Sequence, residues 1–311
     1  MRITLVHNPR AGHGGHDRET LIELLRSAGY DPAYLSSRDD GWRDGLQDPG
    51  SLVVAAGGDG TVSKVARELL GREIPLGVVP VGTANNLAGA FGISGTPEAL
   101  VPCLPGFHPA PFDVGLGAGP GEGGTFFEVA GVGILPEVIR AAKRLAKKEP
   151  EPDSRAAELE RDLRLWRDAV REAECIDCGV VADGRDLSGR YLMAAAFNTA
   201  TLGPRIPLAA GASPGDGELD LLLVGAGDRA ALLALVDARL ERREDGAPAL
   251  PLHRVRAVRL GWRDAPFYLD DEVEADEPCT GDDADGPCVA DLSLHPGALR
   301  VMVPRDPQRG E

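Results

Sequence analysis

The first hundred residues alternate short apolar runs with stretches of helical periodicity. The apolar runs predict buried strands at residues 3–7, 52–56 and 75–80. Helices are predicted at residues 17–28 and 62–70, and a shorter one from the turn at 82–86 to Phe91. Strands that alternate with helices indicate a parallel sheet covered on both faces, and such sheets bind ligands at the carboxyl ends of their strands. We therefore predict an α/β domain over residues 1–112.

From Asp113 onward, strand patterns dominate. Strands are predicted at residues 113–116, 126–132, 176–182, 191–198, 219–224, 255–262, 267–269, 289–294 and 298–303, and helices at 136–148, 153–174 and 228–243. This order indicates a mostly antiparallel β domain with inserted helices over residues 113–303, whose last residues could return to the first domain.

The helix predicted at 153–174 carries an apolar stripe. Leu159, Leu163, Trp166 and Val170 recur at helical spacing along it. Such a stripe either lies on a membrane or packs against a core. The strongly acidic polar face of this helix favours the core.

Net charge narrows the classes of partner. The 311 residues carry a formal charge of −16, with 43% hydrophobic and 26% charged residues. This excess of acid argues against broad nucleic-acid binding, because phosphate backbones attract clustered Lys and Arg. It also argues against a purely electrostatic attachment to anionic membranes. The one local basic cluster consists of Arg140, Lys143, Arg144, Lys147 and Lys148.

The apolar runs are too short for a membrane span. The longest contain seven residues, such as Ala230 to Val236, whereas a spanning helix needs about 20. With no signal-peptide pattern at the N-terminus, these features predict a cytoplasmic protein whose five cysteines are reduced. Cys175, Cys178, Cys279 and Cys288 lack the two tight pairs typical of a zinc site. The acidic stretch at 270–291 is predicted to be a solvated loop without EF-hand spacing.

A glycine turn carries the first candidate chemistry. Gly57-Gly58-Asp59-Gly60-Thr61 follows a predicted strand and opens a predicted helix. Such a turn lets backbone N–H groups approach phosphate oxygens, and the helix dipole favours their negative charge. Asp59 could orient Mg²⁺ or bind nucleotide hydroxyls. The alternative is a tight turn without a ligand, since Gly and Asp both favour turns. P-loop and dinucleotide-dehydrogenase patterns are missing from the sequence.

A second glycine turn follows the next strand. Gly82-Thr83-Ala84-Asn85-Asn86 again precedes a predicted helix, and its Thr and Asn side chains suit helix capping or ligand binding. By itself this turn indicates a cap. Together, the two turns would place two anion-attracting helix N-termini at one edge of the sheet, as a triphosphate requires.

The ordered motifs resemble the diacylglycerol kinase catalytic domain family, which includes bacterial soluble lipid kinases, sphingosine kinases and ceramide kinases. The resemblance rests on Asn8–Gly12, the two glycine turns, Asp113-Val114-Gly115, Asn198-Thr199, residues 214–220 and residues 268–272. It implies a Rossmann-like three-layer N-terminal domain that binds nucleotide. It also implies a mostly antiparallel β-sandwich C-terminal domain for the lipid, and an interdomain cleft for both substrates.

The resemblance also implies roles for individual residues. ATP and Mg²⁺ would be the cofactors, with Asp59 contacting Mg-ATP or its ordered waters as a catalytic residue. The nucleotide would be bound by Asn8, Gly57, Gly58, Asp59, Gly60, Thr61, Gly82, Thr83, Asn85 and Asn86. Asp113 would support the cleft, and Glu272 would be the general base that takes the proton of the acceptor hydroxyl. Asp216 would be a ligand of a structural Mg²⁺; without the resemblance, Asp216-Gly217 predicts a hairpin turn.

Two positions depart from the family pattern. Asn86 stands where the family commonly has aspartate, and Asp271 stands where it has glycine. We predict that an amide at position 86 withholds a negative charge from the magnesium–water network. We also predict that Asp271 disfavours a positive φ at its position.

The favoured function is an ATP-dependent lipid kinase. Its expected partner is a lipid substrate at a membrane surface, which the chain would reach peripherally, without nucleic acid and without a transmembrane segment. A homodimer is left open. The alternatives are an NAD kinase-like enzyme, which also uses a Gly-Gly-Asp-Gly turn, and a catalytically silent protein that binds nucleotide or lipid.

Overall fold

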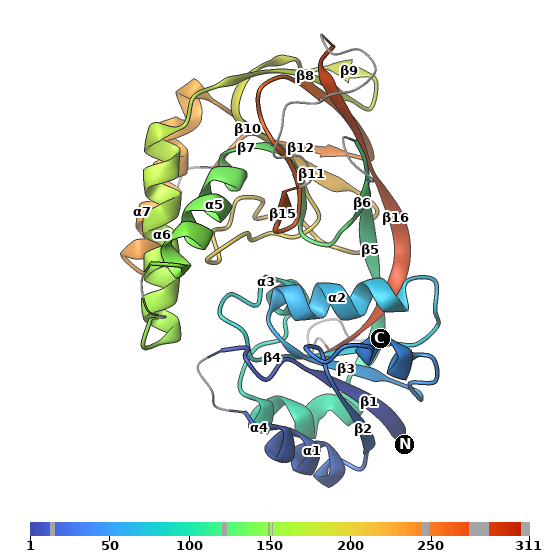
Figure 1. Ribbon diagram of the computed structural model, residues 1–311. Coiled ribbons are helices and arrows are strands. Elements are labelled where there is room, and N and C mark those ends of the chain that lie inside the picture. Colours follow the sequence, from blue (N-terminus) through green and yellow to red (C-terminus); the bar gives the residue numbers. More distant parts are fainter. Residues whose placement is uncertain are drawn as a thin grey trace. The chain divides into compact units, whose positions relative to one another are not determined.

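The computed structural model describes residues 1–12, 16–119, 123–148, 150, 152–243, 249–273 and 286–305. Figure 1 labels its helices and strands. The chain forms two compact units. The first consists of Met1–Phe112 and Pro296–Glu311, and the second of Asp113–His295.

The first unit contains a parallel sheet. Its strands are β1 (Arg2–His7), β2 (Asp31–Ser36), β3 (Val53–Gly57) and β4 (Leu76–Pro80). They lie in the order β4-β3-β1-β2, and the end of β16 (Cys288–Val303) adds a parallel strand at which Val301 pairs with Leu76. The carboxyl ends of β1, β3 and β4 therefore lie at one edge of the sheet.

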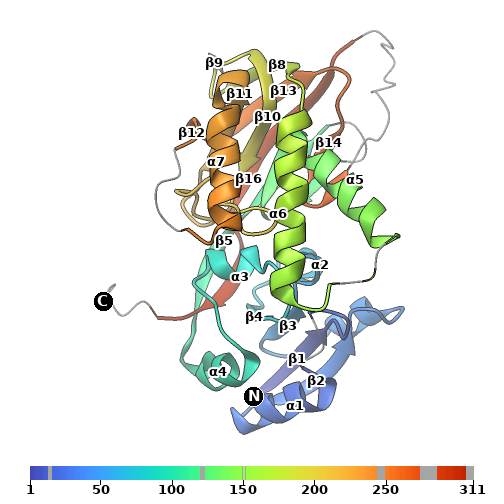
Figure 2. The same ribbon diagram turned by 90° about the vertical axis from the view of Figure 1, so that its left-hand side faces the viewer.

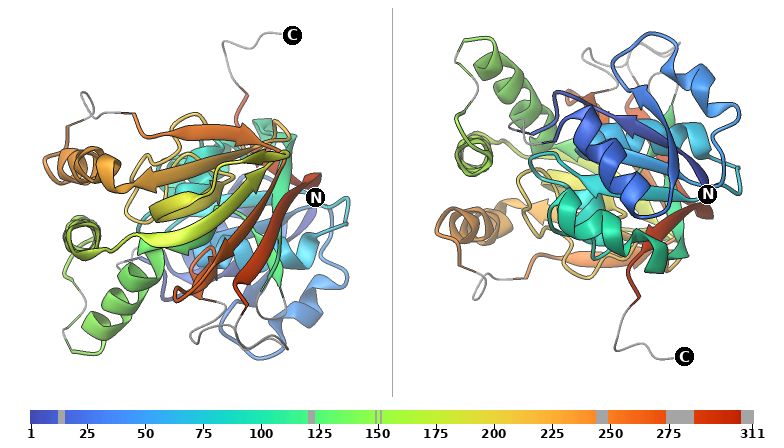
Figure 3. Two further views of the ribbon diagram at one scale, coloured as in Figure 1. Left: turned by 90° about the horizontal axis from the view of Figure 1, so that it is seen from above. Right: turned by 90° about the horizontal axis from the view of Figure 1, so that it is seen from below.

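Helices cover both faces of this sheet. They are α1 (Arg18–Ser27), α2 (Asp59–Leu69), α3 (Asn86–Ala90) and α4 (Pro97–Leu100), with 3₁₀ turns at Trp42–Leu46 and Val101–Gly106. Figure 1 shows α2 on one side of the strands and α1 with α4 on the other, and the right panel of Figure 3 shows α1 in front of the sheet. The predicted three-layer α/β architecture is confirmed.

The local sequence predicts the helix α1 but does not predict the strand β2. The Asp17 side chain caps α1 by accepting from Thr20 N at 2.7 Å, and the apolar stripe buries Leu21 and Leu25 against the sheet. The strand β2, in contrast, was not predicted. It contains Pro32 and borders only β1, and an edge strand tolerates proline because the missing N–H would face away from the sheet.

The second unit is built from antiparallel strands. They are most of β5 (His108–Ala118), β6 (Gly124–Phe126), β7 (Val129–Gly133), β8 (Ile176–Ala182), β9 (Arg185–Asp186), β10 (Gly189–Phe197), β11 (Leu219–Gly225), β12 (Leu252–Val255), β13 (Ala257–Trp262), β14 (Phe267–Leu269), β15 (Glu272–Val273) and the first half of β16. Strand β10 pairs antiparallel with β7, β8 and β11, and β13 pairs antiparallel with β8 and β16. The predicted antiparallel β-sandwich is confirmed.

Alternating residues of β10 separate two cores. Met193, Ala195 and Phe197 pack toward the helices α5 (Ile134–Ala146), α6 (Arg155–Glu172) and α7 (Arg229–Leu240), which follows the 3₁₀ turn Ala226–Asp228. Ala194 and Ala196 pack into the other core, which β8, β13 and β16 complete. Figure 2 shows α6 and α7 side by side along these strands, and the left panel of Figure 3 shows both helices nearly end-on.

The stripe on α6 faces the core. Leu163, Trp166 and Val170 are buried among the residues of the helix-side core. The sequence interpretation that preferred core packing to membrane contact is confirmed. In the part of the chain that the structure describes, no helix is both long and apolar enough to cross a membrane.

Two expectations need correction. Residues 289–294 and 298–303, predicted as separate strands, belong to the single strand β16, in which Gly297 adopts a φ of 58° without ending the pairing. Cys288 is disulfide-bonded, so the expectation that all cysteines are reduced is wrong for Cys288. Cys103, Cys175 and Cys178 are free. Cys279 and most of the acidic stretch at 270–291 lie outside the described residues.

Candidate active site

The two glycine turns of the first unit touch each other. Gly57 ends β3, Gly58 caps α2 and Gly82 follows β4. A Cβ atom on Gly82 would lie only 2.3 Å from Gly58 Cα and 2.9 Å from Gly58 N. The two backbones can therefore pack this closely only because neither residue carries a side chain.

The loop after β1 joins the same group. Asn8 Nδ2 donates to Thr61 Oγ1 at 3.3 Å, and Asn8 N donates to Ala56 O at 2.9 Å. Gly12 has a φ of 68°, and a Cβ atom there would lie 2.3 Å from Val81 O. Three loops at the carboxyl ends of β1, β3 and β4 thus form one cluster, in which Gly60 lies exposed on the first turn of α2.

The carboxylate of Asp59 links the two turns. Asp59 lies in the first turn of α2, and its Oδ1 accepts from Leu87 N at 2.9 Å, in the first turn of α3. Burial raises the pKa of Asp59 above its usual range, and the backbone N–H groups of Leu87, Asn86 and Asn85 oppose this rise. A half-buried carboxylate therefore sits where two helices begin.

Asn85 shapes the second turn from within. Its backbone is left-handed, with φ 55° and ψ 48°, a region that Asn tolerates better than most residues. Its side chain accepts from Gly82 N at 3.0 Å and donates to Gly82 O at 2.8 Å. Asn86 is the buried first residue of α3, and Thr83 is partly buried in the turn. The sequence predicted these residues as capping or ligand-binding groups, and Asn85 here fixes the turn itself.

In the second unit, the structure brings together three segments that were singled out in the sequence. Asp113 is buried, and its Oδ2 accepts from Gly217 N at 2.8 Å. The Nδ2 of Asn198 donates to Asp113 O at 2.8 Å and to Phe127 O at 3.0 Å. Asp113 and Asn198 therefore fix the positions of backbone segments.

Glu272, the predicted base, follows a two-residue turn. It is exposed, begins β15 and pairs with Leu269 of β14. The turn residue with a positive φ is Asp270, at 54°, and Asp271 is exposed and lies outside the positive-φ region. Asp271 thus avoids the positive φ that it was expected to disfavour, and the left-handed position is one residue earlier, at Asp270.

Asp270 is a functional candidate that the sequence interpretation missed. Its buried carboxylate accepts from three successive backbone N–H groups, those of Phe127 at 3.0 Å, Glu128 at 2.8 Å and Val129 at 3.2 Å. This arrangement ties the Glu272 turn to the segment that also bonds Asn198. The signal in the sequence was an Asp directly after an apolar strand, which by itself resembles any turn residue.

Asp216, the predicted metal ligand, already has a cationic partner. Arg254 Nη2 lies 2.5 Å from Asp216 Oδ2, and Asp216 Oδ1 accepts from Glu218 N at 3.1 Å. The described residues include no group of three or more His, Cys, Asp and Glu side chains placed to hold a metal ion. The donor set around Asp216 therefore does not fit Mg²⁺.

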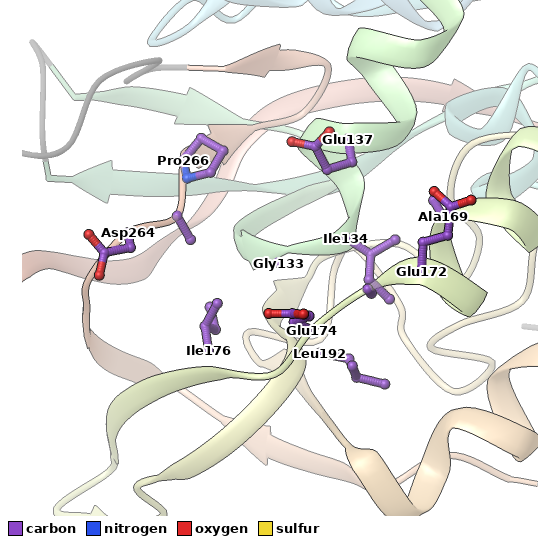
Figure 4. A pocket seen from close by; sticks show the side chains of 12 residues that line it. Gly133, Ile134, Glu137, Ala169, Glu172, Glu174, Ile176, Leu192, Asp264 and Pro266 are labelled. Carbon is purple, nitrogen blue, oxygen red and sulfur yellow. The ribbon is translucent and has the colours of Figure 1, made fainter.

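A separate pocket lies on the helical side of the second unit. Its volume is about 350 Å³, and four carboxylates line it together with Ile134, Ile176 and Leu192. Figure 4 shows Asp264, Glu137, Glu172 and Glu174 on different sides of the pocket. None of the residues predicted for the active site lines it. Its acidic lining would repel a polyphosphate, so the glycine turns remain the candidate nucleotide site.

Two family models match consecutive parts of the chain. The diacylglycerol kinase catalytic domain matches residues 2–116, and the YegS C-terminal NAD kinase beta sandwich-like domain matches residues 162–303. Residues 2–116 therefore belong to the diacylglycerol kinase catalytic domain family, and residues 162–303 to the beta sandwich-like domain. The motifs at 8–12, 57–61 and 82–86, which contribute to the resemblance, all lie in the first match.

Two relatives named diacylglycerol kinase match most of this chain. A diacylglycerol kinase of Mycobacterium tuberculosis is 26% identical, with 98% of this chain and 96% of the relative covered. A diacylglycerol kinase of Bacillus subtilis is 25% identical over 72% of this chain and 73% of its own. A crystal structure of a diacylglycerol kinase from Bacillus anthracis superposes with a TM-score of 0.72 at 20% identity, covering 99% of this chain and 97% of that one. At that identity the superposition supports the fold alone.

Proposed function

We propose that this chain is an ATP-dependent lipid kinase that transfers the γ-phosphate of ATP to a hydroxyl of diacylglycerol or a related lipid. The observation that carries the proposal is the contact between Gly58 and Gly82, which joins two helix-initiating turns in one unit. A triphosphate needs closely spaced backbone N–H groups that no side chain screens. The first turn of α2, with Gly58 and Gly60, supplies such a surface.

Asp59 would serve the nucleotide through its charge. One of its oxygens accepts from Leu87 N, and an ionised carboxylate has further acceptor positions for waters bound to a metal ion. Asp59 therefore fits Mg²⁺ that accompanies ATP. When bound, Mg²⁺ neutralises charge on the transferred phosphate. The carboxylate itself orders the two helix starts around the phosphates.

Glu272 would act on the acceptor. The proposed role is to accept the proton of the lipid hydroxyl as the oxygen attacks the γ-phosphorus atom, while ADP leaves. An exposed carboxylate on a turn anchored by Asp270 suits this role, since its backbone is held while its oxygens stay accessible. Asp113 and Asn198 would act indirectly, by fixing the segments around that turn.

The acceptor would be reached at a membrane surface. Lys143, Arg144, Lys147 and Lys148 are exposed on the last turns of α5 and just beyond it, in a chain whose net charge is −16. Basic residues near an anionic leaflet contribute about 1 kcal/mol each. This cluster is therefore our proposed contact with anionic lipid.

The test is phosphate transfer from labelled ATP with Mg²⁺. The purified protein is incubated with diacylglycerol, sphingosine, ceramide or NAD, and the labelled product is identified by chromatography. We expect label in a phosphorylated lipid. Glu272→Gln should lower kcat about 100- to 10,000-fold, as loss of a general base does, and leave the KM for ATP within about threefold. Asp271→Asn, at the neighbouring exposed carboxylate, is the matched control and should keep normal turnover.

Each alternative has its own signature. Label in NAD, with none in lipid, would establish the NAD kinase-like reaction. Normal nucleotide binding without transfer to any of the four acceptors would indicate a silent binding protein. An equal loss of ATP affinity and turnover in Glu272→Gln would remove Glu272 from the role of base.

A further inference from the structure

A single guanidinium gathers the carboxylates of the turn between Pro214 and β11. Arg254, on β12, places Nη2 2.5 Å from Asp216 Oδ2 and 2.8 Å from Glu218 Oε2. The same arginine pairs across the strands with Asp220 of β11. Two carboxylates therefore contact one guanidinium, and the charge of Arg254 also acts on the nearby carboxylate of Asp220.

These carboxylates would repel one another without a cation. Asp220 is buried, and burial raises its pKa; Arg254 opposes the rise, whereas Asp216 and Glu218 reinforce it. Hard divalent cations such as Mg²⁺ and Ca²⁺ choose carboxylate oxygens of this kind. Arg254 occupies that electrostatic position with a charge that is permanent at physiological pH.

We infer that Arg254 is the built-in cation of this turn, and that it holds residues 213–220 in place without a divalent metal. The inference differs from the family resemblance, which implied Mg²⁺ at Asp216. It is independent of the proposed kinase reaction, because it concerns how the turn is held.

The turn also helps to hold other segments of the second unit in place. Gly217 N donates to the buried Asp113 carboxylate at 2.8 Å, and Asp113 N donates to Pro214 O at 3.1 Å. Asn198 then bonds Asp113 O and Phe127 O. A cation that fixes the turn therefore also fixes the segments on which Asp113 and Asn198 act.

The test measures thermal unfolding in the absence of nucleotide. Arg254→Gln removes the charge and keeps a polar side chain of similar length, and we expect Tm to fall by about 2–4 °C. Arg256→Gln is the matched control, because Arg256 is 80% exposed and its Nε lies 4.0 Å from Glu218; its Tm should change by less than about 1 °C. Each protein is measured in EDTA, in Mg²⁺ and in Ca²⁺ at millimolar concentration.

The cations separate the outcomes. Arg254→Gln should recover most of its lost Tm in Mg²⁺ or Ca²⁺, because the carboxylates of the turn then face an empty cation position. In the wild-type protein and in Asp216→Asn, any response of Tm to these ions should be equal. A wild-type stabilisation by Mg²⁺ that Asp216→Asn abolishes would show that the native turn binds metal and would overturn the inference. An unchanged Tm in Arg254→Gln, or a loss that neither ion restores, would overturn it as well.

Discussion

The two units hold their important loops by opposite means. In the first unit, the turns after β3 and β4 meet through bare backbone at Gly58 and Gly82, and Asn85 fixes one of them with its amide. In the second unit, turns are held by carboxylates that accept backbone N–H groups, at Asp113 and at Asp270. One region depends on missing side chains and the other on charged ones.

This difference follows from what each region would bind. A surface that binds phosphates needs backbone N–H groups that point outward. The N–H groups of its loops therefore cannot donate to carboxylates inside the protein. Asp59 is the exception in the first unit, and burial raises its pKa. Loops that only position another residue have no such restriction, and a buried carboxylate that accepts three N–H groups is a strong anchor.

The largest effect is expected from a methyl group at the contact of the glycine turns. In Gly82→Ala the new Cβ would meet the backbone of Gly58 at 2.3 Å, and backbone cannot move aside as a flexible side chain can. We expect kinase turnover to fall at least about 100-fold, as a misplacement of about 1 Å can cause. Steady-state kinetics with labelled ATP measure the loss.

The control for this variant lies in the same segment. Gly89 is in α3, and a Cβ atom there would meet nothing within 4 Å. Gly89→Ala should therefore keep its activity and gain slightly in stability, since Ala is the better helix residue. Equal activity of Gly82→Ala and Gly89→Ala would refute a functional role for the contact.

In the second unit, the next largest effect is expected from removal of the negative charge of Asp270. Asp270→Asn keeps the left-handed turn accessible but turns a donor toward the N–H groups of Phe127 and Glu128. We expect Tm to fall by about 4–8 °C, because hydrogen bonds to charged groups are among the stronger ones, and kcat to fall with it as the Glu272 turn loosens. Asp271→Asn, on the exposed neighbour, should stay within about 1 °C. If the Tm of Asp271→Asn fell as much as that of Asp270→Asn, Asp270 would not be the residue that holds the turn.

The smallest effect is expected in Asp59→Asn, and it should be an increase of Tm. Because burial raises the pKa of Asp59, the folded state favours its protonated form, and this contribution to stability is lost as pH rises through the folded pKa. The Tm of Asp59→Asn should therefore equal the wild-type Tm near pH 4 and exceed it by about 2 °C at pH 8. Thermal unfolding across that range checks the trend. A variant less stable than the wild type at pH 8 would mean that the backbone donors outweigh burial.

Prediction from sequence succeeded where a pattern is local. The apolar runs predicted the strands β3 and β4, and the apolar stripe on α6 predicted which face of that helix is buried. It failed at β2, where Pro32 weakens the strand signal, and at Gly297, which was read as a break within β16. Both positions are tolerated because of the neighbouring strands, which no local window reports.

The sequence by itself determined the α/β and antiparallel β architectures, the family and the glycine turns, because each depends on short-range periodicity or on motifs in a fixed order. Only the tertiary structure decided that Gly58 packs on Gly82, that Asp270 holds the segment at 127–129 and that Arg254 meets Asp216. These contacts join residues 24 to 143 positions apart. Charge and hydrogen bonding act through space, so their partners are fixed only when the strands take their order in the sheet.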